Sequence, residues 1–238
     1  MVCIYRRAGK VVVVTGAAGA LGHAVFEYFA SGGARVVALD YSHELLDSAY
    51  PVKGSMHQYQ EVDLTSRNSC QLVLSKVIDD LGRIDVLCNI AGGFLMGEAV
   101  HETSDSTWDF LFNLNTRSIV NTSSVVVPHM QQQGNGKIVN IAAKAATQGF
   151  ANMGVYTASK AAVMRLTEAM AAELREQQIN VNCIMPGTID TPRNREDMPE
   201  ADHSKWVPPS QLASVIGFLA SDAAVAVHGA AIPVDGLS

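Results

Sequence analysis

Tyr156 and Lys160 are the two residues whose types and spacing point most directly to chemistry. They lie four residues apart in a helical pattern, so their side chains project from one helix face and can meet over a single site. A phenol with a pKa near 10 is a poor acid–base group at neutral pH unless a nearby ammonium favours its phenolate. The pair therefore predicts a site where Lys160 lowers the pKa of Tyr156, suited to protonating the alkoxide that hydride transfer leaves. Such a pair also arises by chance on exposed helices, so its meaning depends on the rest of the chain.

A glycine-rich turn lies near the start of the chain. Residues 11–22 run from four valines through Gly16, Gly19 and Gly22 into a helical pattern. Glycines permit a tight turn and a close approach to a pyrophosphate, whose charge is attracted by the free N–H groups at the start of the helix. A glycine turn can also simply join a strand to a helix, but its place between the first strand and the first helix favours a dinucleotide site.

Asp40 stands about 20 residues after this turn, at the end of the second strand pattern. A carboxylate there can accept hydrogen bonds from both hydroxyls of an adenosine ribose, and it repels a 2′-phosphate. Tyr41 follows it, and Ala17 and Ala18 in the turn are not basic, so no cation is placed for the phosphate of NADP(H). The sequence favours NAD(H). Asp40 can at the same time cap a helix from Ser42 onwards.

Short apolar runs alternate with longer amphipathic stretches along the whole chain. Seven runs predict strands: Lys10–Thr15, Arg35–Leu39, Met56–Val62, Asp85–Ala91, Lys137–Ala142, Ile179–Met185 and Ala231–Val234. Five stretches predict helices: Leu21–Ser31, Ser66–Leu81, Ser104–Val127, Val155–Gln177 and Ser210–Ala220. The alternation predicts a single α/β domain over residues 1–238, with a Rossmann-like, doubly wound parallel sheet of about seven strands and helices on both faces. Functional residues should then follow the carboxyl ends of the strands.

The composition excludes several classes of protein. A chain of 238 residues with 48% hydrophobic and 17% charged residues fits one compact domain, and its net charge of −6 argues against nucleic acid or an anionic membrane as partner. Cys3, Cys70, Cys88 and Cys183 form no C-x-x-C pair, and the histidines lack metal-ligand spacing, so we expect no metal. Without a signal-peptide core or an apolar run of about 18–20 residues, we expect a cytoplasmic protein, with residues 1–9 as an N-terminal extension.

The order and spacing of the motifs resemble the short-chain dehydrogenase/reductase family over essentially the whole chain. The matching motifs are Thr15-Gly16 to Gly22, Asp63-Leu64, Asn89-Ile90-Ala91-Gly92, Asn115, Tyr156-x-x-x-Lys160 and Pro186-Gly187. The resemblance implies an oxidoreductase that transfers a hydride between a nicotinamide cofactor and a small carbonyl, alcohol or quinonoid substrate. Tyr156, Lys160 and Asn115 would be catalytic, with Lys160 also on the nicotinamide ribose. Asn115 would anchor a water in a proton relay, unless its amide only packs within the helix with satisfied hydrogen bonds.

The resemblance also assigns the binding residues. Asp63 and Leu64 would hold the adenine, Asn89 to Gly92 the ribose, and Pro186 to Thr191 the carboxamide. Asp63 could instead cap the helix from Ser66, and Pro186-Gly187 could merely end a strand. The expected cofactor residues are Gly16, Ala18, Gly19, Ala20, Leu21, Gly22, Asp40, Tyr41, Asp63, Leu64, Asn89, Ala91, Gly92, Tyr156, Lys160, Pro186, Gly187, Ile189 and Thr191.

The polar connection over residues 188–209 is long, which is typical of a substrate loop. The expected substrate contacts are Gly93, Phe94, Ala143, Arg193, Met198 and Trp206, with Asn194, Leu95 and Met96 as further candidates. Phe94, Leu95 and Met96 could equally be packing residues.

Two positions depart from the family pattern. The middle glycine of the turn is Ala20, with Gly19 one place earlier, which puts the seating of the phosphate in question. Ala143 stands thirteen residues before Tyr156, where the family has a serine that donates to the substrate carbonyl. Removing such a donor can cost about 10²–10³ in rate. Lys144 could replace the donor or be a surface charge, and we favour the surface charge.

The chain also resembles dihydropteridine reductases in four places, namely residues 189–202, Trp206, Ala91-Gly92-Gly93 and the segment 143–146. Those enzymes also lack the serine, and their quinonoid substrate can be reduced at a ring nitrogen. Dihydropteridine reduction is therefore a narrower alternative. A dinucleotide-sensing protein without turnover is an alternative of another class, against which the retention of Tyr156 and Lys160 argues.

Self-association is a further expectation. The two longest predicted helices carry apolar side chains on more than one face, among them Val120, Val127, Val163 and Ala169. Since the counterparts of these helices pair subunits in the family, we expect a homodimer or homotetramer.

Overall fold

One parallel sheet organises the chain. The structure is a computed structural model that describes residues 8–237, so Cys3 and residues 1–7 of the expected N-terminal extension lie outside it. The strands are β1 (Val11–Thr15), β2 (Arg35–Asp40), β3 (Gln58–Glu61), β4 (Val86–Asn89), β5 (Gly136–Ile141), β6 (Ile179–Pro186) and β7 (Ala231–Val234). They pair in the order β3-β2-β1-β4-β5-β6-β7, which confirms the predicted doubly wound sheet.

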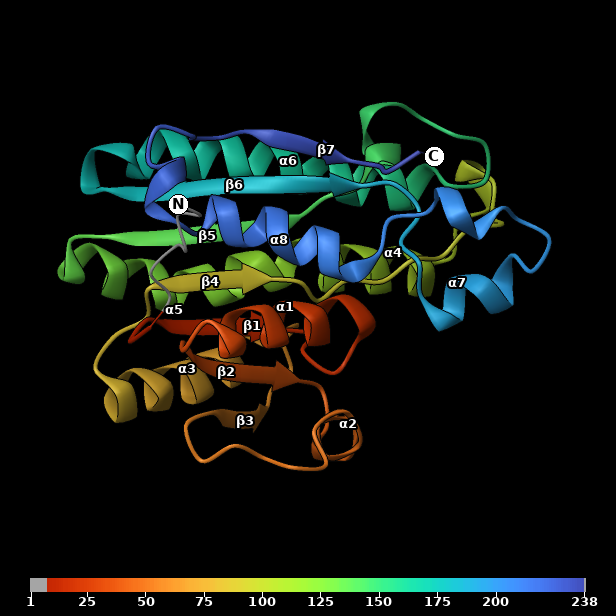
Figure 1. Cartoon of the computed structure of the whole chain (residues 1–238). Coiled ribbons are helices and arrows are strands. Elements are labelled where there is room, and N and C mark those ends of the chain that lie inside the picture. The colour runs from red at the N-terminus through yellow and green to blue at the C-terminus, as the bar shows by residue number, and fades with distance from the viewer. Residues whose placement is uncertain (1–7, 238) are drawn as a thin grey trace.

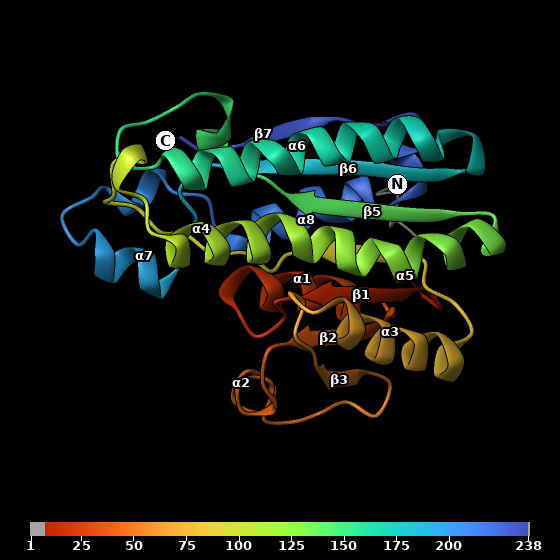
Figure 2. The same ribbon diagram turned by 180° about the vertical axis from the view of Figure 1, so that it is seen from behind.

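Helices cover both faces of this sheet. They are α1 (Ala20–Ser31), α2 (His43–Ala49), α3 (Arg67–Leu81), α4 (Asp105–Phe112), α5 (Ser118–Gln133), α6 (Gly154–Leu174), α7 (Pro192–Asp197) and α8 (Pro209–Leu219). α1 and α8 pack together on one face (Figure 1), and the view from behind shows α3, α5 and α6 on the other (Figure 2). Within residues 8–237, no helix combines the length and the apolar character that crossing a membrane requires.

The valines of β1 explain why the strands read as continuous apolar runs. Val12 and Val14 belong to the core beneath α1 and α8, whereas Val11 and Val13 belong to the core beneath α3 and α5. Successive side chains of a strand point to opposite faces, so a strand covered on both sides needs apolar residues at every position.

Several boundaries differ from those predicted. The expected helix over 104–127 is divided into α4, a π-helical turn at Asn113–Arg117, and α5. α5 also continues through Pro128, and the fully buried Met130 anchors its last turns in the core. The third strand is shorter than predicted, and the short helices α2 and α7 were not predicted at all. The cap of α2 is the Ser42 hydroxyl, which accepts from the Leu45 N–H at 3.2 Å.

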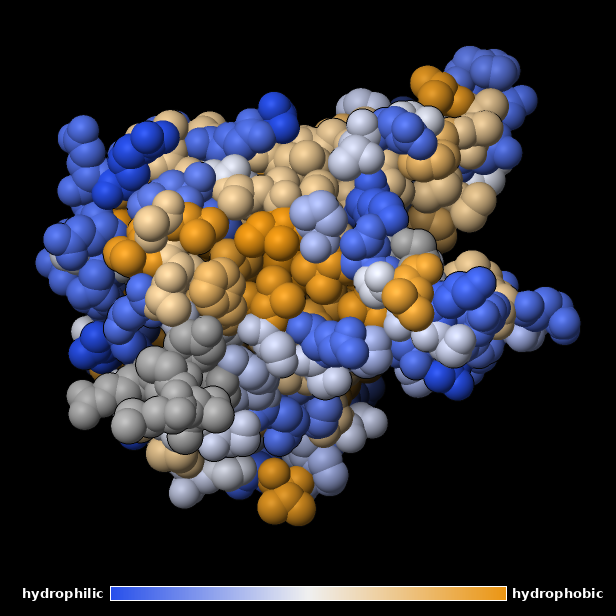
Figure 3. Space-filling model, turned by 45° about the horizontal axis from the view of Figure 1, so that its top comes forward, coloured by the Kyte–Doolittle hydropathy of each residue, from blue (hydrophilic) through white to orange (hydrophobic). Residues whose placement is uncertain are grey.

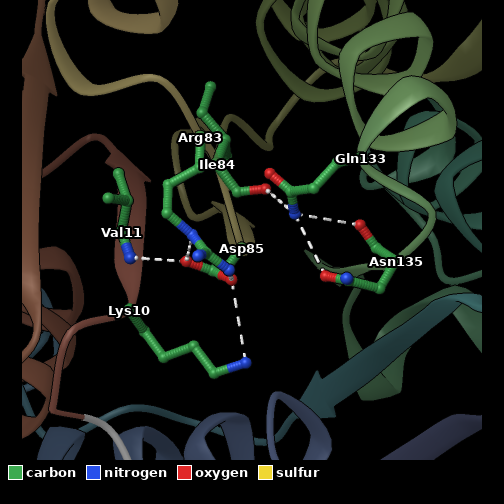
Figure 4. A network of polar contacts seen from close by, with 7 residues as sticks. All are labelled: Lys10, Val11, Arg83, Ile84, Asp85, Gln133 and Asn135. Carbon is green, nitrogen blue, oxygen red and sulfur yellow. Dashed lines mark hydrogen bonds and ion pairs between the residues drawn. The ribbon is translucent and has the colours of Figure 1, made fainter.

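A polar network fixes the amino ends of the central strands (Figure 4). The Asp85 side chain is only 2% exposed, and its carboxylate accepts the N–H of Val11 at 2.8 Å and two bonds from the Arg83 guanidinium. The Lys10 ammonium lies 3.7 Å away, and the Gln133 amide donates to the Ile84 carbonyl. These bonds hold the amino ends of β1 and β4 together, at the end of the strands opposite to the glycine turn.

Candidate active site

A large cavity opens at the carboxyl ends of the strands. The strand arrows in Figure 1 point toward the side where α4 and α7 lie, and residues following β1, β2, β4, β5 and β6 line the cavity. β1 pairs with both β2 and β4, so the winding reverses beside it, which is where ligands of such sheets bind. The cavity volume of about 1530 Å³ exceeds the 300–1,000 Å³ of usual small-molecule sites and leaves room for a dinucleotide together with a substrate.

The glycine turn forms one end of the cavity. Gly16 has a φ of +63°, and a Cβ there would lie 2.9 Å from the Ala91 Cα atom. A Cβ on Gly22 would lie 2.0 Å from the Gly16 carbonyl oxygen, so both positions require glycine. The residue preceding α1 is Gly19, which has no side chain to cap the first turn, so the N–H groups there are left to a ligand. This arrangement fits the pyrophosphate of a nicotinamide dinucleotide.

Two side chains hold this turn from the neighbouring elements. Asp40 at the end of β2 accepts the Ala18 N–H at 2.8 Å and the Tyr41 N–H at 2.7 Å. The buried Tyr50, directly after α2, donates its hydroxyl to the Ala17 carbonyl at 2.7 Å. The contact of Tyr50 with the turn was not predicted, because α2 was not predicted and no sequence spacing links Tyr50 to the turn. The turn is therefore rigid even though Ala20 replaces the family's middle glycine.

Most of the expected cofactor residues line the cavity. These are Gly16, Ala18, Gly19, Leu21, Gly22, Asp40, Tyr41, Asp63, Leu64, Ala91, Gly92, Tyr156, Lys160, Pro186, Gly187 and Ile189. The Asp63 carboxylate accepts both the N–H and the hydroxyl of Thr65, whereas the cap of α3 is Ser66. The cap alternative for Asp63 is therefore wrong.

Three expected cofactor residues lie elsewhere. Asn89 is buried, donates to the Asn140 side-chain oxygen and accepts from the Thr122 hydroxyl, both at 2.9 Å, so its side chain ties the strands to α5. Thr191 uses its hydroxyl to cap α7 and, like Ala20 at the start of α1, lines a separate shallow groove. These three side chains do not line the large cavity, and their predicted cofactor contacts stay predictions.

Tyr156 and Lys160 lie on α6 and both line the cavity, as their spacing predicts. Lys160 is only 5% exposed, and its ammonium nitrogen donates to the Ile141 carbonyl at 2.8 Å. The ring of Phe94 packs edge-on against the Tyr156 ring, with centroids 4.8 Å apart and planes at 85°. The phenol is thus held against an apolar wall beside a buried amine.

Burial dominates the ionisation of this pair. It raises the pKa of Tyr156 to about 12 and lowers the pKa of Lys160 to about 8. The predicted lowering of the Tyr156 pKa by Lys160 is therefore wrong for the protein alone, because desolvation penalises both charged forms. At neutral pH the phenol keeps its proton, which suits a proton donor, and Lys160 keeps most of its ammonium character.

Asn115 is bonded to the loop after β4 and to α6. It lies buried in the π-helical turn, where its oxygen accepts the Gly93 N–H at 2.8 Å. Its two amide hydrogens go to the Gly93 carbonyl and the Ser159 hydroxyl, each at 3.0 Å. Both amide hydrogens are therefore donated within the protein, and the side chain positions the loop after β4 against α6. The water relay through Asn115 stays a prediction.

The substrate end of the cavity contains some of the expected contacts. Gly93, Phe94, Met96, Ala143, Asn194 and Met198 line it. Arg193 instead pairs with Asp197 at 2.8 Å and borders the shallow groove, and Trp206 is 8% exposed and packs on His203. Neither side chain lines the cavity, because the polar connection folds locally into α7 and a 3₁₀ turn rather than remaining an open loop, and their substrate contacts stay predictions.

Other lining residues were missed. Phe110, Asn113 and Leu114 enter from α4 and the π turn, and Phe150 and Met153 enter from the segment before α6. The i, i+3, i+4 spacing of the first three is a sequence signal for one exposed helix face. No comparable signal marks the second pair, since the path of that segment depends on tertiary contacts.

The position of the absent serine lies in the cavity wall. Ala143 follows β5 in an extended conformation, is 6% exposed and lines the cavity. Next to it, the partly exposed Lys144 forms an ion pair with Asp235 at 2.5 Å. The Lys144 ammonium, which we expected to be a surface charge, is therefore neutralised by the Asp235 carboxylate.

The chain matches a known family along most of its length. Residues 10–202 fit the family model described as short chain dehydrogenase. The chain belongs to this family. It is 37% identical to 3-oxoacyl-[acyl-carrier-protein] reductase FabG of Thermotoga maritima, covering 97% of this chain and 98% of that protein. It is 36% identical to dehydrogenase/reductase SDR family member 6 of Aquarana catesbeiana, covering 96% of each chain.

A further relative is the NAD-dependent glycerol dehydrogenase of Listeria innocua, at 33% identity over 95% of this chain and 92% of that protein. Family membership makes the chain an oxidoreductase, and it implies a nicotinamide cofactor, either NAD or NADP. The narrower resemblance to dihydropteridine reductases stays a prediction.

Proposed function

We propose that this short chain dehydrogenase is an NAD(H)-dependent oxidoreductase that interconverts a small carbonyl compound and its alcohol, with Tyr156 as the proton donor. The observation that carries the proposal is that the half-buried Tyr156 and the buried Lys160 together line the wall of the cavity that begins at the glycine turn. A protein that only senses a dinucleotide needs no proton donor at that place.

When bound, the nicotinamide ring supplies or takes up the hydride. The protonated phenol of Tyr156 donates to the substrate oxygen as negative charge develops there, which is general acid catalysis. We infer that the Lys160 ammonium, one helical turn away on α6, offsets part of the charge of the phenolate that remains, although burial sets the net direction of the Tyr156 pKa in the protein alone. Phe94 fixes the phenol ring, and Asn115 fixes the loop that carries Phe94.

The preference for NAD(H) rests on Asp40. Its carboxylate lines the cavity and is oriented by two backbone N–H groups, so it is placed to accept ribose hydroxyls and to repel a 2′-phosphate. Among the described residues that line the cavity, the only lysines or arginines are Lys144 and Lys160, and neither comes from the elements around Asp40. In a fluorescence titration we expect NADH to bind at least tenfold more tightly than NADPH. Equal or tighter NADPH binding would contradict the preference.

Ala143 supports two other candidate functions. Without the hydroxyl, a ketone is polarised less, which favours either reduction of a quinonoid dihydropterin or dinucleotide sensing without turnover. Loss of NADH absorbance with a panel of ketones and with quinonoid dihydropterin separates these functions. Turnover of ketones supports the main proposal, turnover of the pterin alone supports the second, and tight NADH binding with no oxidation supports the third.

We also propose a homodimer or homotetramer. Hydrophobic residues gather at the centre of the face in Figure 3, on the side of the sheet that α1 and α8 cover, whereas α5 lies on the opposite side (Figure 2). On the helices expected to pair, Val120 and Ala169 are exposed as the proposal requires, but Val163 is buried in the core. Sedimentation at micromolar concentration tests this proposal, and a purely monomeric boundary would contradict it.

A further inference from the structure

Large apolar side chains surround the cavity beyond Tyr156. Phe94, Met96, Phe110, Phe150 and Met198 all line it while remaining between 41% and 59% exposed. They come from four separate segments of the chain, before and within α4, before α6 and after α7. Apolar side chains gathered around a cavity in this way mark a site at which a ligand covers them.

Three of the polar side chains that line the cavity are already bonded within the protein. Asn113 accepts from the Arg117 guanidinium at 2.7 Å, and Asn194 donates to the Ile189 carbonyl at 2.8 Å. Thr147 donates to the Lys144 carbonyl at 2.9 Å. A polar substrate body that relied on these three bonded groups would have to break such bonds, at a cost of about 1–3 kcal/mol for each group left unpaired.

Charge argues in the same direction. The Lys144 ammonium is paired with Asp235 at 2.5 Å, so an anionic substrate would have to displace that carboxylate. Asp109, which is exposed and also lines the cavity, would repel an anion. The substrate end therefore favours a neutral molecule.

We propose that the substrate is an uncharged ketone, or the matching secondary alcohol, whose body is an apolar alkyl or aryl group. This proposal rests on the proposed function of the same site. An apolar body against Phe94 places the carbonyl beside Tyr156, because the two rings are in contact. The carbonyl carbon accepts the hydride and the oxygen accepts the Tyr156 proton, so the ketone is reduced as the cofactor is oxidised, and solvent restores the proton. Met96, Met153 and Met198 are flexible, so we expect a range of chain lengths to fit.

The test is a series of methyl ketones from 2-butanone to 2-decanone, assayed with NADH. Each added methylene that reaches the apolar walls should raise kcat/KM by up to about fourfold, mainly through KM. Dihydroxyacetone, an oxo acid and quinonoid dihydropterin serve as polar, anionic and heterocyclic comparisons, and we expect each to be at least tenfold poorer than 2-octanone. Calorimetry of ketone binding to the inactive Tyr156→Phe protein should give a heat-capacity change that becomes more negative along the series.

Substitutions of lining residues test whether the preference for longer ketones arises in this cavity. Phe150→Gln and Met198→Gln should each raise KM for 2-octanone about fivefold, and more than they raise it for 2-butanone. The control is Leu72→Gln on α3, an apolar side chain that is also exposed, at 65%, but lies outside the cavity, so it should change neither value.

The outcomes separate the two proposals. If kcat/KM stays constant or falls along the ketone series, and dihydroxyacetone, the oxo acid or the pterin is preferred, the proposal of an apolar substrate is overturned. The oxidoreductase proposal then stays in place. If no substrate oxidises NADH, the proposed function fails. The calorimetric series then still decides whether the cavity selects apolar ketones.

Discussion

Restoring a hydroxyl at position 143 should accelerate ketone reduction. Ala143 lines the cavity in the place where the family carries its serine, and Ala143→Ser adds only one oxygen to a side chain that faces the cavity. A donor to a developing oxyanion is worth about 2.7–4 kcal/mol. Holding the new hydroxyl in one of three staggered rotamers costs about 0.65 kcal/mol, which leaves about 2–3.4 kcal/mol. We therefore expect kcat/KM for a methyl ketone to rise about 30–300-fold.

The assay is NADH oxidation at saturating cofactor, with NADH affinity measured separately by fluorescence. Ala145→Ser is the matched control, because it adds the same hydroxyl two residues further on in the same cavity wall, and it should change kcat/KM less than threefold. If Ala143→Ser binds NADH normally but gains nothing with any ketone, the reasoning about carbonyl polarisation at this position is refuted. The reaction of this chain would then not depend on a donor there.

Three further changes test the turn and the buried lysine. Gly22→Ala should weaken NADH binding about 10–100-fold, since its Cβ would lie 2.0 Å from the Gly16 carbonyl oxygen, and unchanged affinity in a fluorescence titration would contradict the turn geometry. Tyr50→Phe should raise the Kd and KM for NADH about 5–10-fold with little change in kcat, because it removes only the bond to the Ala17 carbonyl; a selective loss of kcat would contradict this. Burial lowers the Lys160 pKa to about 8 in the folded protein, so between pH 8 and about 10.5 the unfolded chain binds more protons. The free energy of unfolding of the wild type should therefore rise with pH over this window, relative to Lys160→Met, by about 3 kcal/mol in urea titrations, and a constant difference would contradict the burial of an ionisable amine.

The sequence predicted the sheet and the place of the reactive pair because these depend on local patterns. Continuous valines in β1 reflect a strand covered on both faces, and Gly16 and Gly22 reflect backbone contacts too close for a side chain. Tyr156 and Lys160 share a helix face through their spacing alone.

What the sequence did not predict depends on tertiary contacts. Burial, which is absent from a spacing rule, raises the pKa of Tyr156 rather than lowering it. The Asn115 side-chain amide bonds to Gly93 and Ser159, which are distant in sequence. Arg193 and Trp206 turn away from the cavity because the connection after β6 folds on itself, and Tyr50 reaches the glycine turn across 33 residues of chain.

The activity of Tyr156→Phe tests the central claim most directly. The substitution keeps the ring and its contact with Phe94 but removes the proton, so NADH should bind within about twofold of the wild type. We expect kcat/KM for carbonyl reduction to fall at least 100-fold, as general acid catalysis contributes about 10²–10⁴. Undiminished turnover by Tyr156→Phe would show that the phenol is not the proton donor.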